Sequence, residues 1–205
     1  MSEVRIHPTA IIEPGVQLGR GTSVWDNVHI RSDAILGDEC IVGEKAYIAY
    51  GVKIGHRCKI NAFVYICAAV TLEDGVMIAA HTVFTNDRFP RATTPDLKHL
   101  QSSDLAADNP QTLVREGATI GANCTIGTGI TIGRWAMVGM GSVVTKNVPD
   151  HMLVLGNPAK AVGIVCKCGQ LMARLPLDDP DPSLDCAACS RFYAHVEGVT
   201  VEVPE

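Results

Sequence analysis

The chain has 205 residues and a formal net charge of −5, and only 5% of its residues are aromatic although 19 are glycine. This charge, without a cluster of basic residues, does not suit nucleic acid as the main partner, because phosphate binding needs a concentrated positive surface. The few aromatic residues and many glycines indicate a narrow interior and frequent tight turns.

The first residues, MSEVRIHPTA, include no apolar stretch of signal-peptide length, and no later window is apolar over a membrane span. We therefore expect a cytoplasmic protein with no membrane partner. In a reducing compartment, its eight cysteines are expected to be core residues, metal ligands or reactive thiols before disulfides are considered.

An apolar residue recurs at every sixth position from Ile6 to Phe84, and in the same phase from Val114 to Val144. The residue four places after each of these anchors is nearly always small or β-branched, and glycines fall one or three places after them, where tight turns favour the absence of a Cβ. A period of six does not match one face of an α-helix. The pattern predicts an all-β solenoid of very short strands joined by turns.

Three cysteines, Cys40, Cys58 and Cys124, occupy the small-residue position of the repeat and are expected to be inert core residues. Cys67 follows its anchor directly, and a core role is favoured for it as well.

Residues 85–113 interrupt the repeat with a long segment that begins TNDRFPRA. A non-repetitive loop of this length inside a compact domain is typically functional or disordered. The density of polar, charged and aromatic groups between Thr85 and Ala92 favours function.

The chain resembles the hexapeptide-repeat nucleotide-sugar N-acetyltransferases, in particular those that act on 3-amino sugars. The resemblance covers about residues 4 to 165 and is carried by three segments: VFTNDRFPRA (83–92), TLVREGATIGANCTIGTGITIG (112–133) and GSVVTKNVPDHMLVLGNPAKAVG (141–163). It implies a left-handed parallel β-helix over residues 1–163, with the protruding loop 85–113 inserted. It also implies a homotrimer whose sites lie between neighbouring subunits, with acetyl-CoA and a nucleotide-linked amino sugar as substrates.

In that family the asparagine matching Asn86 holds the sugar amine near the thioester. A neutral amine is already a nucleophile, so the reaction needs mainly positioning, an oxyanion donor and a destination for one proton. Asp87, Arg88 and Arg91 are the candidate substrate contacts in the same segment. Ala68 stands where some relatives have a carboxylate, which leaves the identity of the sugar and of the acyl group open.

His81 supports an alternative function, because related O-acetyltransferases use a histidine as general base to deprotonate a hydroxyl acceptor. A γ-class carbonic anhydrase would share the solenoid but needs three zinc-binding histidines; here Asn86 and Val64 occupy two of the matching positions. A non-catalytic scaffold subunit is the third alternative.

The resemblance places coenzyme A along the last coils. There Gly139 and Gly141 permit close approach to the backbone, and Lys146 and Lys160 are candidates to meet phosphates. In similar enzymes the segment Asn157-Pro158-Ala159-Lys160 lies near the nucleotide end of the cofactor.

The repeat stops after Gly163, and residues 164–205 contain two close cysteine pairs, Cys166/Cys168 and Cys186/Cys189, separated by seventeen residues. Four thiolates in two pairs suit a tetrahedral structural zinc site without an open coordination position. We therefore favour zinc over free thiols or a disulfide pair and expect a small zinc-ribbon-like unit, in which the apolar segment FYAHVEGVTVEV supplies one or two strands.

Overall fold

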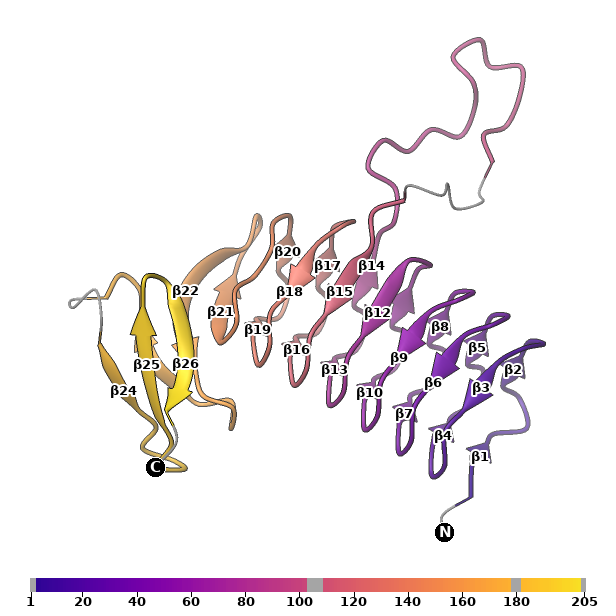
Figure 1. Ribbon diagram of the computed structural model, residues 1–205. Coiled ribbons are helices and arrows are strands. Elements are labelled where there is room, and N and C mark those ends of the chain that lie inside the picture. Colours follow the sequence, from indigo (N-terminus) through magenta and orange to yellow (C-terminus); the bar gives the residue numbers. More distant parts are fainter. Residues whose placement is uncertain (1–2, 103–108, 178–181, 204–205) are drawn as a thin grey trace.

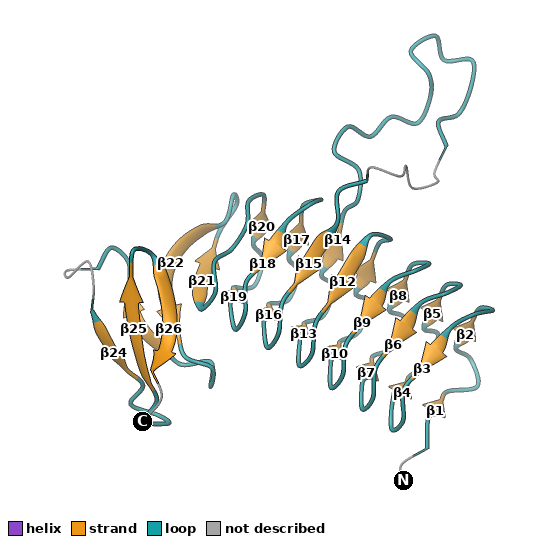
Figure 2. Ribbon diagram, viewed as in Figure 1, coloured by secondary structure: helices purple, strands orange, loops and turns teal. Residues whose placement is uncertain are grey.

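A computed structural model of the chain describes residues 3–102, 109–177 and 182–203. The predicted all-β solenoid is confirmed, since short strands wind into stacked coils with three strands in each coil (Figures 1 and 2). Within the described residues, no helix has the length and apolar character needed to cross a bilayer.

Each face of the solenoid is one parallel sheet, in which a strand pairs with the strand three hexads away. The first sheet contains β1 (Arg5–Ile6), β4 (Ser23–Val24), β7 (Ile41–Val42), β10 (Lys59–Ile60), β13 (Met77–Ile78), β16 (Thr119–Ile120) and β19 (Met137–Val138). The second contains β2 (Ile11–Ile12), β5 (His29–Ile30), β8 (Tyr47–Ile48), β11 (Tyr65–Ile66), β14 (Val83–Phe84), β17 (Thr125–Ile126) and β20 (Val143–Val144). The third contains β3 (Gln17–Leu18), β6 (Ile35–Leu36), β9 (Lys53–Ile54), β12 (Val70–Leu72), β15 (Thr112–Val114) and β18 (Thr131–Ile132).

The anchor residues of the repeat point inward and form one continuous core. From Val24 onward every anchor is buried, and so are the companion positions, including Cys40, Cys58 and Cys124 as predicted. The thiol of Cys58 lies 3.1 Å from the carbonyl oxygen of Glu73, which gives this buried sulfur a polar contact. The anchor Ile6 is different: it is 47% exposed, because β1 lies at the open end of the stack.

The insertion leaves the stack after β14 and projects away from it before the chain returns (Figure 1). It ends at residue 111, because Thr112 already pairs with Val70 as the first residue of β15. Val83 and Thr125 are parallel partners on either side of the insertion, so the coils continue in register across it.

The C-terminal segment changes from parallel to antiparallel pairing. β21 (Met152–Leu155), β22 (Lys160–Val165) and β23 (Leu171–Arg174) extend the first sheet, and β22 therefore spans the predicted domain boundary after Gly163. β24 (Ser183–Asp185), β25 (Phe192–Val196) and β26 (Val199–Val203) form a separate antiparallel sheet, in which the segment FYAHVEGVTVEV supplies two strands. A second small core, which includes Ile164, Leu184 and Tyr193, lies beneath it.

Candidate active site

A cavity of about 620 Å³ lies where the insertion leaves the second sheet. The outer surface of the coils that precede β14 forms its floor, between Arg31 and Ala68. The insertion forms its roof, which includes Asn86, Asp87 and Arg91. The structure therefore brings three of the predicted site residues together in one polar hollow.

Stacking of the coils explains why the floor is hollow. The positions directly after the strands of the second sheet form a column, Arg31, Ala49, Cys67 and Thr85, since their strands pair in that register. The next position gives a second column, Ser32, Tyr50, Ala68 and Asn86. Small side chains at 49, 67 and 68 leave space beneath Asn86, and larger ones at 31 and 50 close the lower end.

Two hydrogen bonds hold the backbone around Asn86 in place. The Nδ2 atom of Asn109 donates a hydrogen bond to the backbone carbonyl of Asn86 at 2.9 Å, and the Thr85 hydroxyl donates to the carbonyl of Ile126 at 3.1 Å. The side-chain amide of Asn86 is half-buried and makes no hydrogen bond within the described part of the chain. It is therefore held in place but available to a ligand.

Asp87 has a local structural role, since its carboxylate accepts a hydrogen bond from the backbone N–H of Phe89 at 2.8 Å. This Asx turn shapes the start of the insertion. Arg91 lines the cavity while donating to the carbonyl of Pro90 at 2.9 Å. Arg88 is not among the lining residues; its guanidinium lies instead on the side of Gly129.

His81 lies at a different corner of the coil from Asn86. It sits between β13 and β14, whereas Asn86 follows β14, so the two side chains are separated by a strand of the second sheet. The His81 ring is exposed and stacks on Phe63, with a centroid distance of 4.8 Å and an interplanar angle of 7°. It does not line the cavity, and one chain by itself does not bring His81 and Asn86 together.

The structure adds Arg31, Tyr47 and Tyr65 to the cavity wall, three residues that no motif in the sequence indicated. Arg31 forms an ion pair with Glu13, with 2.6 Å between Nε and the carboxylate oxygen. Contact with the Arg31 guanidinium, opposed by partial desolvation and supported by the Ser32 amide and by His29, lowers the pKa of Glu13 to about 2. The signal in the sequence was the spacing of 18 residues between Tyr47 and Tyr65, which the repeat converts into a stack.

The cavity floor contains a thiol that stays protonated at neutral pH. Cys67 is buried, and desolvation raises the pKa of its thiol to about 12. A thiol in this state is a poor nucleophile, which agrees with the predicted core role.

The candidate coenzyme A residues gather on the last coil of the solenoid. Hydrogen bonds from the Val143 amide to Gly156 and from the Ala159 amide to Val143 hold the turn containing Asn157 and Pro158 against β20. Lys160 follows at the start of β22, and Lys146 lies after β20 in the same column as Asn86, two coils further along. At about 4.8 Å per coil, this places Lys146 roughly 10 Å from the Asn86 position along the axis.

The two predicted glycines of the cofactor site differ in their surroundings. A Cβ at Gly139 would approach the Leu155 side chain to 1.8 Å, so packing within the chain already accounts for this glycine. Gly141 has a φ of +72° and open space around it, which leaves room for a ligand to approach its backbone.

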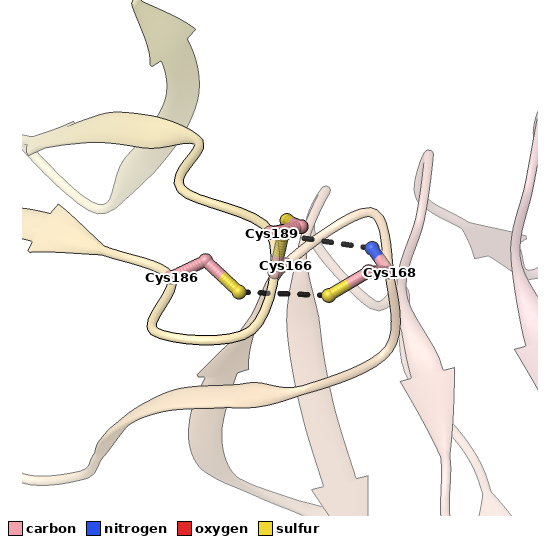
Figure 3. A group of neighbouring side chains, drawn as sticks. All are labelled: Cys166, Cys168, Cys186 and Cys189. Atoms are coloured by element: carbon pink, nitrogen blue, oxygen red, sulfur yellow. Dashed lines mark hydrogen bonds between the residues drawn. The ribbon is translucent and has the colours of Figure 1, made fainter.

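The four cysteines of the C-terminal segment are brought together (Figure 3). Their sulfur atoms all lie within 4.8 Å of one another, with Cys166 to Cys189 at 3.4 Å and Cys168 to Cys186 at 3.5 Å. The Tyr193 hydroxyl contacts the Cys166 sulfur at 3.2 Å and accepts a hydrogen bond from the Lys167 amide at 3.1 Å, which joins the cluster to the separate sheet.

Comparison with known proteins gives the family. The family model described as bacterial transferase hexapeptide (six repeats) matches residues 16–50, 51–86 and 111–146. A dTDP-3-amino-3,6-dideoxy-alpha-D-galactopyranose 3-N-acetyltransferase from Aneurinibacillus thermoaerophilus is 36% identical over 199 residues, covering 97% of this chain and 94% of that protein. Serine acetyltransferase 4 from Arabidopsis thaliana is 29% identical over 94% of this chain, but the chain spans only 36% of its length.

Among solved structures, AntD, an N-acyltransferase from Bacillus cereus in complex with dTDP and 3-hydroxybutyryl-CoA, shares the fold. Its TM-score is 0.53 at 15% identity, and the match covers 80% of this chain and 81% of that one. At this identity the likeness concerns the fold alone.

Stacked hexapeptide repeats with a polar cavity beneath an inserted loop define the class as a hexapeptide-repeat transferase. The chain belongs to the bacterial transferase hexapeptide family. Within that family, its predicted resemblance to the nucleotide-linked 3-amino-sugar N-acetyltransferases is confirmed by the 36% identity over nearly the whole chain.

Proposed function

We propose that the chain transfers an acetyl group from acetyl-CoA to the amine of a nucleotide-linked amino sugar, with a 3-amino sugar as the favoured acceptor. The observation that carries this proposal is the available side-chain amide of Asn86, held over a hollow of about 620 Å³. The relative from Aneurinibacillus thermoaerophilus, whose name specifies such a reaction, supports it.

The chemistry of the cavity favours an amine acceptor over a hydroxyl. No histidine of the same subunit lies among the described residues that line it. A hydroxyl acceptor needs a base during attack, whereas a neutral amine does not. An amine also keeps its proton until the new bond has formed.

In the proposed mechanism, the Asn86 side-chain oxygen accepts a hydrogen bond from the amine and orients its lone pair toward the thioester carbonyl carbon. The N–C bond forms, the C–S bond breaks, and the departing coenzyme A sulfur takes the surplus proton of the amine. Asp87 and Arg91 flank the sugar. Coenzyme A extends along the coils toward Lys146, Asn157 and Lys160, with Gly141 open to it.

We further propose that the solenoid winds left-handed and that the cavity is completed in a homotrimer. Exposed apolar side chains on two outer faces, Ile35 on the third sheet and Ile41 and Met77 on the first, support assembly through these faces. Native mass spectrometry and light scattering are expected to give three chains, and a stable monomer that retains full activity would contradict the shared site.

The acceptor proposal is tested by release of coenzyme A thiol in the presence of acetyl-CoA and a panel of dTDP-, UDP- and GDP-linked sugars. We expect turnover with 3-amino sugars, less with 4-amino sugars and none with the matched 3-hydroxy sugars. Turnover with the hydroxy sugars alone would transfer the catalytic role to His81.

For the C-terminal segment we propose a structural zinc ion held by Cys166, Cys168, Cys186 and Cys189. A tetrahedral Zn–S distance of about 2.3 Å places the sulfur atoms roughly 3.8 Å apart. The closest pairs here, at 3.4 and 3.5 Å, fit this geometry. Four thiolates fill the coordination shell, so the metal would stabilise the segment and take no part in transfer.

Metal analysis of protein purified without chelator is expected to give one zinc per chain. Cys186→Ser is expected to abolish the metal, and Cys124→Ser, a buried cysteine of the solenoid, is expected to leave it in place. Metal-free protein with a fully ordered C-terminal segment would refute the assignment.

A further inference from the structure

Three aromatic rings form a column on the second sheet, and two of them, Tyr47 and Tyr65, line the lower wall of the cavity. His29, Tyr47 and Tyr65 are register partners on successive coils of the second sheet. The Tyr47 and Tyr65 rings are stacked at 5.0 Å with an interplanar angle of 6°, and His29 meets Tyr47 edge-on at 5.5 Å. Tyr65 is 42% exposed and lines the cavity, so part of its ring is open to a ligand there.

Beside this column the guanidinium of Arg31 is fixed from two sides. Its Nη1 donates a hydrogen bond to the Tyr47 hydroxyl at 2.8 Å, and its Nε lies 2.6 Å from the Glu13 carboxylate. Glu13 is fixed in turn by the Ser32 amide at 2.9 Å and the His29 ring at 2.8 Å. A guanidinium has five N–H donors, so hydrogens on both terminal nitrogens remain for a ligand.

The charges around the hollow suit an anionic ligand. Arg31 contributes one cation from the floor and Arg91 another from the roof. Asp87 is the one carboxylate among the described lining residues, and it already accepts the Phe89 amide. A planar guanidinium held in one orientation matches the oxygens of a phosphate group in a two-point contact.

Arg31 and Asn86 lie at opposite ends of the same hollow. Arg31 is three coils below Thr85 in its column, which at about 4.8 Å per coil separates the two backbone positions by roughly 14 Å along the axis. The Arg31 side chain spans part of this separation. A ligand with a reactive amine at one end and an anionic group further along therefore fits between them.

We propose that Arg31, positioned by Glu13 and Tyr47, binds the diphosphate of the nucleotide-linked acceptor, with the Tyr65 ring forming the adjacent wall. The identity of this ligand as an acceptor rests on the proposed function. Coenzyme A also carries a diphosphate, so the experiment must separate these two sources of the same group.

The experiment measures binding of dTDP and, separately, of coenzyme A to the full-length protein by calorimetry. Arg31→Met is expected to weaken dTDP binding by about 10- to 100-fold, since it removes charge-assisted hydrogen bonds. Coenzyme A affinity should stay within about twofold, because no contact to Arg31 is lost. Arg20→Met is the matched control: Arg20 also pairs with a carboxylate, Asp38, but lies outside the cavity, and both affinities should be unchanged.

Arg31→Lys guards against loss of fold, because it keeps a positive charge beside Glu13 while removing the planar guanidinium that contacts Tyr47 and the ligand. It is expected to weaken dTDP binding in a protein that still unfolds in one cooperative transition. If both Arg31→Lys and Arg31→Met bind dTDP as tightly as the wild type, the proposal is overturned. It is also overturned if the two variants lose affinity for coenzyme A alone.

Failure of this site is distinguishable from failure of the proposed function. If amino sugars are acetylated but Arg31→Lys leaves KM for the acceptor unchanged, the site is wrong and the function stands. If dTDP binds through Arg31 but no amino sugar is acetylated, the binding site stands and the function is wrong.

Discussion

Replacement of Asn86 by alanine tests the chemistry with little disturbance of the structure. The contact that fixes Asn86 is made by its backbone carbonyl, which Asn109 reaches at 2.9 Å, and alanine retains that carbonyl. Its side-chain amide makes no hydrogen bond within the described residues, so the loss falls on the ligand. Loss of a group that orients a reactant, with a shift of about 1 Å in its position, costs about 10²-fold in kcat, or about 2.7 kcal/mol.

The assay is steady-state release of coenzyme A thiol, with kcat and both KM values measured for wild type and variant. We expect Asn86→Ala to lower kcat, while its oligomeric state and melting temperature remain those of the wild type. Gln111→Ala removes an exposed amide from the same insertion, outside the cavity, and should behave as wild type. An Asn86→Ala enzyme with near-normal kcat would refute the assigned role.

Two further predictions concern stability. Ile66→Ala, at a fully buried anchor between Ile48 and Phe84, should lower the free energy of unfolding by about 2 to 5 kcal/mol in denaturant titrations. Lys59 is exposed, so Lys59→Ala should leave the denaturation midpoint unchanged. Equal losses of unfolding free energy in the two variants would contradict the conclusion that the anchors face inward. The folded-state pKa of Glu13, about 2 against an ordinary 4.5, means that its stabilisation is complete above about pH 4.5 and is lost as pH falls toward 2. The melting-temperature gap between wild type and Glu13→Gln should therefore shrink from pH 7 to pH 3, and a gap that does not change would exclude this ion pair as its source.

The solenoid could be predicted from the sequence because one physical rule governs each coil. An apolar anchor every six residues must face inward, and the strand pairs confirm that phase across the insertion, as with Phe84 and Ile126. The rule weakens at the open end, where Ile6 has no coil below it and stays exposed. The C-terminal segment has no repeat, so only its cysteine spacing and apolar strands could be recognised.

The site was predictable only in part. The six-residue period shows which residues stack on one another in successive coils, but it does not show where the inserted loop folds over them. Asn86, Asp87 and Arg91 meet in the cavity, whereas Arg88 lies outside it in a segment without periodicity. His81 and Asn86 are close in sequence, yet the strand between them turns them to different corners. Stacking positions three hexads apart would have revealed the Tyr47 and Tyr65 column, although its meaning depends on where the insertion folds.

The proposed reaction depends on the cavity beneath the insertion as the acceptor site, and a structure of the protein with coenzyme A and a nucleotide-linked 3-amino sugar tests this site most directly. We predict the sugar amine within about 3.2 Å of the Asn86 side-chain oxygen, with the diphosphate against Arg31. A sugar bound elsewhere, with the hollow between Asn86 and Arg31 left to solvent, would contradict it.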